Sequence, residues 1–153
     1  MSDIPGAIAL AISIAAFGFS LLSYVLQRAK DRRDLFLNLH RTLIEPELQE
    51  GRRRLHVLDE SRLGTIQDED LDGYQQINRS LAMFDVFAMY VNRRYISEEL
   101  ALEEWGDVLA RTWTKAEPFI EARYERSGHR PWPHLRALGP RAVAWAASRG
   151  TSI

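Results

Sequence analysis

The longest apolar stretch of the chain lies at its N-terminal end. Residues 4–26, IPGAIALAISIAAFGFSLLSYVL, are 23 residues without a charge. At about 1.5 Å per residue this stretch forms a helix of roughly 35 Å, enough for a hydrocarbon core of about 30 Å. The alternatives are a buried core helix and a cleaved signal peptide, which needs a basic N-terminal region and a shorter apolar run. Because residues 1–3 hold an acid and no base, the pattern favours a retained transmembrane anchor over residues 1–27.

The charges on either side of this stretch indicate its orientation. Basic residues follow it directly: Arg28, Lys30, Arg32 and Arg33. Only Asp3 and the amino terminus precede it. By the positive-inside rule we expect the N-terminus outside and the rest of the chain in the cytoplasm, at the inner (cytoplasmic) membrane of the cell.

A juxtamembrane helix over residues 28–45 is expected to continue the anchor, because no Gly or Pro occurs between Gly18 and Pro46. One seam can be followed along the anchor and its continuation at steps of four and three, and all its positions except Arg32 are small or apolar: Ala11, Ala15, Gly18, Leu22, Val25, Ala29, Arg32, Phe36, Leu39 and Leu43. One interpretation is a parallel homodimer through the anchor helix. The other is that the last three residues pack on the chain's own domain, and we favour it because a coiled coil needs three or four sustained heptads.

Helical periodicity then predicts a bundle over residues 46–138. Pro46 is expected to start a helix to residue 60, with Leu48, Leu55 and Leu58 inward. A helix over residues 74–95 is apolar nearly all round, which predicts the central position. One of its faces consists of Ile77, Leu81, Phe84, Ala88, Val91 and Tyr95.

The C-terminal third follows the same period. Ser97 is a good N-cap, and the inward face after it is expected to contain Leu102, Trp105, Leu109, Trp113 and Ala116. Pro118 is expected to open a short helix that ends at Gly128. Residues 139–153 are predicted to form a basic tail, a weak helix interrupted by Gly139 and Pro140. The predicted fold is all-α: one N-terminal transmembrane helix followed by a small cytoplasmic helical bundle.

Composition narrows the possible functions. The 153 residues are 46% hydrophobic and 27% charged, with a net charge of −1 and no cysteine. Disulfides, thiolate nucleophiles and Cys-based metal sites are therefore excluded. The overall charge makes nucleic acid an unlikely partner, although the GRRR segment at 51–54 and the basic tail keep weak binding to nucleic acid or anionic lipid as an alternative. The acid-rich stretch 59–73 reads as an exposed loop, and the basic tail could instead pack against it.

Asp85 is the one acid within the apolar run SLAMFDVFAMYVNRR, residues 80–94. A buried carboxylate needs a partner, and Arg123 is the best candidate because it lies among apolar residues at helical spacing. We therefore predict a buried polar pair of Asp85 and Arg123. Asn78 and Asn92 lie seven residues on either side of Asp85 and complete a polar stripe. The alternative for Asp85 is a general acid or base in a pocket.

No motif assigns a reaction. The four histidines, His40, His56, His129 and His134, are scattered and have no metal-ligand spacing. Nucleotide-binding glycine motifs and the GxSxG nucleophile motif are missing as well. We expect no metal, no cofactor and no catalytic residues.

The segment Ile77–Leu138 resembles the bacterial domain-of-unknown-function family 4760, and the resemblance implies a bacterial source. The resemblance rests on the long apolar helix with an acid at Asp85, the ISEE helix start at Ile96, Trp113, PFIEAR at 118–123 and WPHLRAL at 132–138. The chain departs from the family pattern at Asp85, where Glu is more frequent. The resemblance implies a membrane helix followed by a small helical domain and implies no activity.

Taken together, these patterns predict a non-enzymatic, membrane-anchored interaction or scaffolding module with an unidentified protein partner. The competing hypothesis is a small membrane-bound enzyme or effector that uses Asp85 and Arg123. An acid that opens into a cleft would favour the enzyme, and a sealed acid would favour the scaffold.

Overall fold

The computed structural model describes residues 4–150, with side chains from Ile12 onward. Its regular elements in this range are all helices, which confirms the predicted all-α class. The chain forms two compact units, Met1–Asn38 and Leu39–Ile153. Parts of three predictions lie outside the described part of the chain: residues 1–3 of the predicted anchor, residues 151–153 of the predicted tail, and the side chain of Ala11 in the predicted dimer seam.

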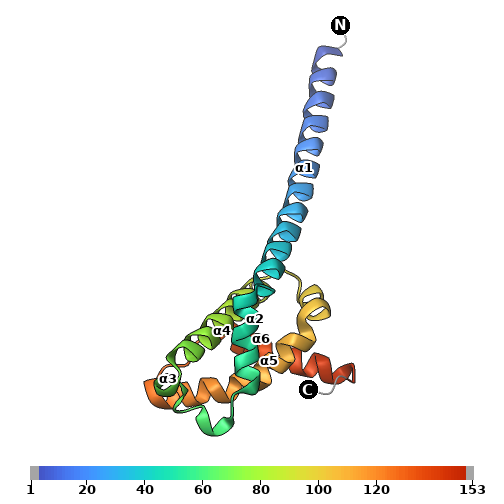
Figure 1. Cartoon of the computed structure of the whole chain (residues 1–153). Helices are drawn as coiled ribbons and strands as arrows, with labels where there is room; N and C mark the ends of the chain where they lie inside the picture. The colour runs from blue at the N-terminus through green and yellow to red at the C-terminus, as the bar shows by residue number, and fades with distance from the viewer. Residues whose placement is uncertain (1–3, 151–153) are drawn as a thin grey trace. The chain divides into compact units, whose positions relative to one another are not determined.

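The first unit is a single helix. Helix α1 spans Ile4–Leu43 without a break, as the lack of Gly and Pro after Gly18 predicted (Figure 1). From Ile12 it is long and apolar enough to cross a membrane, and none of the apolar window is buried by protein. Large side chains such as Phe17 and Phe19 are 72% and 73% exposed.

The last turn of α1 belongs to the second unit. Leu39 and Leu43 are 4% and 1% exposed and form part of the core of this unit. These two positions are therefore not available to a second copy of the chain. The earlier part of the predicted dimer seam stays a prediction.

Helix α4, Leu71–Asn92, is the central helix of the second unit, as predicted. It contacts α2 (Pro46–Val57), α3 (Ile66–Glu69), α5 (Glu98–Ser127) and α6 (Pro133–Ser148). A short 3-10 turn, Glu60–Arg62, precedes α3. The side chain of Asp70 accepts a hydrogen bond from the Gly73 backbone N–H and caps α4, so α4 begins before residue 74. Tyr95 lies beyond its end and is 51% exposed, unlike the rest of the predicted face.

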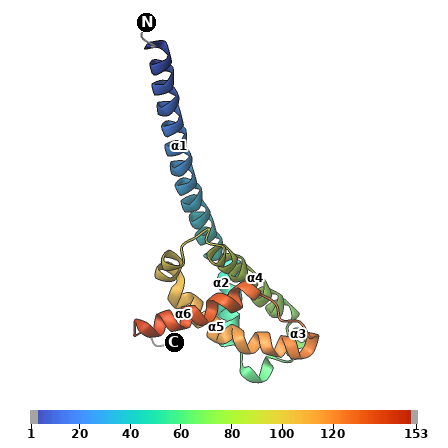
Figure 2. The ribbon, with the colours of Figure 1, turned by 180° about the vertical axis from the view of Figure 1, so that it is seen from behind.

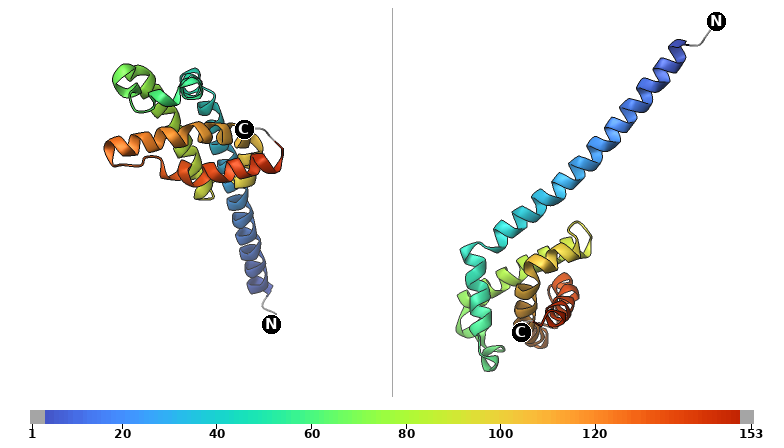
Figure 3. Two further views of the ribbon diagram at one scale, coloured as in Figure 1. Left: turned by 90° about the horizontal axis from the view of Figure 1, so that it is seen from below. Right: turned by 90° about the vertical axis from the view of Figure 1, so that its right-hand side faces the viewer.

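Helices α5 and α6 run side by side (Figures 2 and 3). A Cβ at Gly106 would lie 2.3 Å from the ring of Trp145, and a Cβ at Gly139 would lie 2.3 Å from the ring of Trp113. Because the residue numbers rise along one helix and fall along the other, the two helices are antiparallel. Each tryptophan occupies space that only a glycine on the other helix leaves free.

Two helix boundaries predicted at prolines are wrong, because both prolines lie inside helices. Pro118 lies inside α5, and Pro140 lies inside α6 with Gly139 beside it. The predicted boundary of the tail at residue 139 therefore falls within a helix whose residues Leu138 and Ala142 are completely buried. Proline costs a helix a hydrogen bond, but packing of an apolar face outweighs propensity in a folded domain.

Candidate functional site

The polar stripe of α4 faces the end of α5 and the start of α6. Asp85 Oδ1 accepts hydrogen bonds from the backbone N–H groups of His134 and Leu135, both at 2.8 Å. These N–H groups belong to the first turn of α6, where no preceding carbonyl is available to them. Trp132, the N-cap, has left-handed backbone angles and supplies no side-chain acceptor. Asp85 therefore caps α6 from another helix, and its charge lies at the positive end of the helix dipole.

The predicted pairing of Asp85 with Arg123 is wrong. The Arg123 guanidinium donates to Asn78 Oδ1 and lies between two rings, 5.9 Å from the centroid of Tyr74 and 5.3 Å from that of Trp132. The partner of Asp85 is a pair of backbone donors, and the partners of Arg123 are a neutral amide and two aromatic faces. Asp85 binds the start of α6 because the backbone N–H groups there need an acceptor, and the side chain of the N-cap residue Trp132 supplies none.

Asn92 completes the stripe at the other end of α4. Its side-chain N–H donates to the His134 carbonyl at 3.1 Å, and its Oδ1 accepts from Arg141. Arg141 also pairs with Glu98 at 2.8 Å. All three predicted stripe residues thus bind the segment from Arg123 to Arg141. The stripe holds the C-terminal helices on α4, and the carboxylate of Asp85 is used as a structural acceptor.

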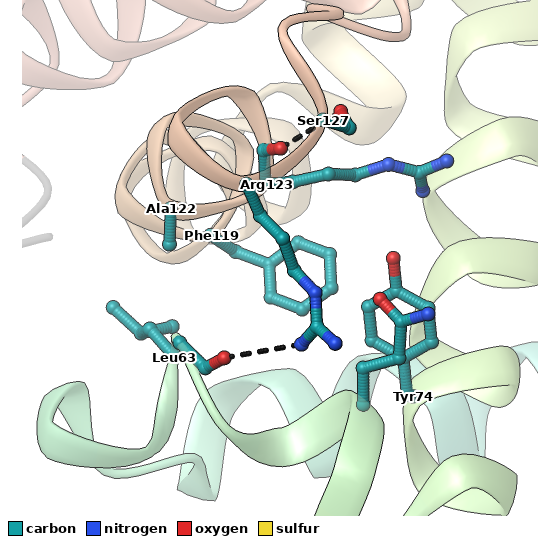
Figure 4. Close-up of a pocket in the computed structure, with 9 residues that line it drawn as sticks. Leu63, Tyr74, Phe119, Ala122, Arg123 and Ser127 are labelled. Carbon is teal, nitrogen blue, oxygen red and sulfur yellow. Dashed lines mark hydrogen bonds between the residues drawn. The ribbon is translucent and has the colours of Figure 1, made fainter.

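A hollow of about 290 Å³ is lined in part by Arg123, the residue that binds Asn78 (Figure 4). The rings of Tyr74 and Phe119 border it with their centroids 5.8 Å apart, and Leu63 lies across from them. The remaining lining residues are polar, small or basic: Gly64, Gln67, Ala122, Arg123, Arg126 and Ser127. No pattern in the sequence predicts this hollow, because its formation requires the 63–67 segment to fold against α5.

The chemistry of this hollow suits binding better than catalysis. Its lining contains no histidine and no carboxylate, so a general base is missing beside the Ser127 hydroxyl. That hydroxyl donates to the Arg123 carbonyl at 2.9 Å. Arg126 pairs with Asp68 at 2.8 Å, which joins the end of α5 to the acid-rich segment.

The arginines of the GRRR segment contact other residues of the second unit. Arg53 and Arg54 both bind Glu50, at 2.7 and 3.1 Å. The hydrogen bond from Arg53, with a further one from Arg54, lowers the pKa of Glu50 to about 2. Arg52 lies instead over the rings of Phe84 and Trp105. The three side chains do not form one free basic face of the kind that nucleic acid requires.

Metal binding finds no support in the part of the chain that the structure describes, where no group of three or more His, Asp and Glu side chains is placed to hold an ion. His40, for example, packs against the ring of Trp105 with centroids 5.3 Å apart. The structure places the three stripe residues against the C-terminal helices and gives Asp85 and Arg123 different partners.

Comparison with known proteins agrees with the sequence resemblance. No curated protein and no solved structure matches the chain. The profile of one family, described as "Domain of unknown function (DUF4760)", matches residues 6–139, which include most of α1 and the bundle as far as the middle of α6. The chain belongs to this family.

Proposed function

We propose that the chain is a single-pass protein of the bacterial inner membrane, with its N-terminus outside and its helical unit in the cytoplasm. In this proposal the helical unit is a non-enzymatic interaction or scaffolding module. The anchor positions the unit at the membrane, and the unit binds a partner there.

The exposed apolar part of α1 is the observation that carries the proposal. Large apolar side chains from Ile12 to Leu26 are each more than half exposed. Water disfavours such a surface by about 25 cal/mol per Å² of apolar area, and a bilayer removes this cost. The basic residues that follow, from Arg28 to Arg33, are exposed and suit the cytoplasmic interface.

The arrangement of the polar groups supports binding over catalysis. Asp85, Asn78 and Asn92 hold helices together, and Asp85 does not line the hollow of Figure 4. A catalytic carboxylate would need access to a substrate, whereas this one satisfies two backbone donors.

A second copy of the chain is the partner that the anchor suits. Ala15 and Gly18 lie one turn apart on α1, and a Cβ at Gly18 would meet nothing within 4 Å. Small residues on one side of a transmembrane helix allow the backbones of two helices to approach closely in lipid.

The test uses the full chain in lipid nanodiscs. Mass photometry is expected to show two copies per disc for the native chain, and fewer after Gly18→Leu, which widens the helix–helix approach. Ile14→Leu is the matched control, because it changes shape without adding bulk. Affinity purification from solubilised membranes extends the test, and recovery of the monomer alone, without any other protein, would contradict the scaffold proposal.

A further inference from the structure

A second hollow, of about 360 Å³, lies between α2 and α5 and is lined almost entirely by basic side chains. Arg52 and His56 come from α2, one turn apart, and Val108 and Arg111 come from α5. Lys115 follows Arg111 by one turn on α5, and its charge acts on His56. We call this hollow, together with the adjacent Lys115, the basic hollow.

The guanidinium groups of Arg52 and Arg111 are oriented by contacts with uncharged groups. The guanidinium of Arg52 lies 5.5 Å from the ring centroid of Phe84 and 5.8 Å from that of Trp105. Arg111 Nε donates to the backbone carbonyl of Asp107 at 3.2 Å. These contacts orient the two guanidinium groups, and neither group forms an ion pair with a carboxylate among the described residues. The contrast is with Arg53 and Arg54, the next residues of α2, which both bind a carboxylate.

The charges that act on His56 have one sign. Burial, followed by the positive charges of Arg111, Lys115 and Arg52, lowers the pKa of His56. Burial also lowers the pKa of Arg52. Asp107 is the nearest acid along α5, but it meets Arg111 through its backbone carbonyl, and its buried Oδ1 has no hydrogen-bond partner in the described part of the chain. Like charges that border one hollow repel, and a bound anion would reduce the repulsion.

We propose that the basic hollow binds a phosphate group, either free or on a lipid headgroup. Guanidinium groups bind phosphate oxygens with two parallel hydrogen bonds, and two of them on facing helices can grip one tetrahedral anion. The ammonium of Lys115 adds a third charge. A bound anion favours the charged form of His56, so His56 takes up a proton on binding and its pKa rises. This site is separate from the membrane anchor and from the hollow of Figure 4.

The experiment is an NMR titration of the full chain in phosphatidylcholine nanodiscs with inorganic phosphate. The ring signal of His56 is assigned by His56→Gln. We expect a saturable shift of this signal and a rise in the pKa of His56.

Arg111→Gln combined with Lys115→Gln should weaken phosphate binding about tenfold. Both side chains are exposed, so the fold should persist, which circular dichroism checks. Arg93→Gln, at an exposed arginine outside the hollow, is the matched control and should bind like the native chain.

Two further arms complete the test. Sulfate keeps its charge between pH 5 and 8, so any change in its affinity over this range comes from the protein. Sulfate should bind at least about fivefold more tightly at pH 5 than at pH 8, because His56 is protonated at pH 5. In phosphatidylglycerol nanodiscs without free phosphate, a raised His56 pKa identifies a headgroup as the source, whereas a rise only on adding phosphate identifies the free anion. No saturable shift in either lipid, or equal binding by the double variant, would overturn the proposal.

Discussion

Replacing Asp85 tests whether the stripe of α4 is a structural cap. Asp85→Ala leaves the backbone N–H groups of His134 and Leu135 without their 2.8 Å acceptor in a partly buried place. Loss of an N-cap costs about 0.5–2 kcal/mol, and a buried donor without an acceptor costs about 1–3 kcal/mol. Alanine favours the helix at position 85 by about 0.5 kcal/mol relative to aspartate. Because the first two ranges describe the same two hydrogen bonds, they are not added, and the expected net loss in unfolding free energy is about 0.5–2.5 kcal/mol.

Asp85→Asn separates the hydrogen bonds from the charge. Both N–H groups donate to the same oxygen, Oδ1, and the amide oxygen of asparagine can take its place. Only the attraction between the carboxylate and the α6 dipole is lost, about 0.3–1 kcal/mol. The asparagine variant should therefore retain most of the stability that the alanine variant loses.

The assay is urea unfolding of the full chain in detergent, followed by tryptophan fluorescence. All four tryptophans lie between Trp105 and Trp145 in the second unit, so the signal reports on that unit. Glu103→Ala, at an exposed position of α5, is the control and should change the unfolding free energy by less than about 0.5 kcal/mol. A loss for Asp85→Asn as large as for Asp85→Ala would refute the cap, because it would show that the charge itself, as in an ion pair, is what matters.

Two other substitutions test separate parts of the fold. Gly139→Ala places a methyl group against the ring of Trp113 and should lower the unfolding free energy by about 1–3 kcal/mol in the same urea assay, whereas Gly64→Ala, with nothing within 4 Å, should leave it nearly unchanged. Equal effects would contradict the α5–α6 packing. The hydrogen bond from Arg53 lowers the pKa of Glu50 from 4.5 to about 2. Between these two pH values the folded state therefore binds fewer protons than the unfolded state. The contribution of Glu50 to stability is lost as the pH falls from 4.5 to about 2. Thermal unfolding measured across this range should depend less on pH in Glu50→Gln than in the native chain, and identical profiles would contradict the pairing.

Helical periodicity predicted the buried faces well. Every member of the predicted face of α5, from Leu102 to Ala116, is at most 7% exposed. The period also placed Asn78, Asp85 and Asn92 on one stripe. These predictions succeed because the side chains that share a helix face are fixed by the sequence itself.

The partners of the stripe could not be predicted in the same way. Asp85 binds backbone groups 49 and 50 residues further along the chain, and a backbone donor leaves no mark in the amino-acid sequence. Local propensity predicts helix boundaries at the two internal prolines, Pro118 and Pro140, because proline lacks a backbone N–H and disfavours a helix interior. Packing of α5 on α6, with tryptophan against glycine on both sides, is a property of the assembled unit.

The most direct test of the membrane anchor is alkaline carbonate extraction of membranes from cells that express the full chain. We expect the native chain to stay in the pellet at full length, and a variant with Leu22→Glu and Val25→Glu to move to the supernatant, because charged side chains at that depth are costly in lipid. Recovery of the native chain in the supernatant, or removal of its first residues by signal peptidase, would contradict the account.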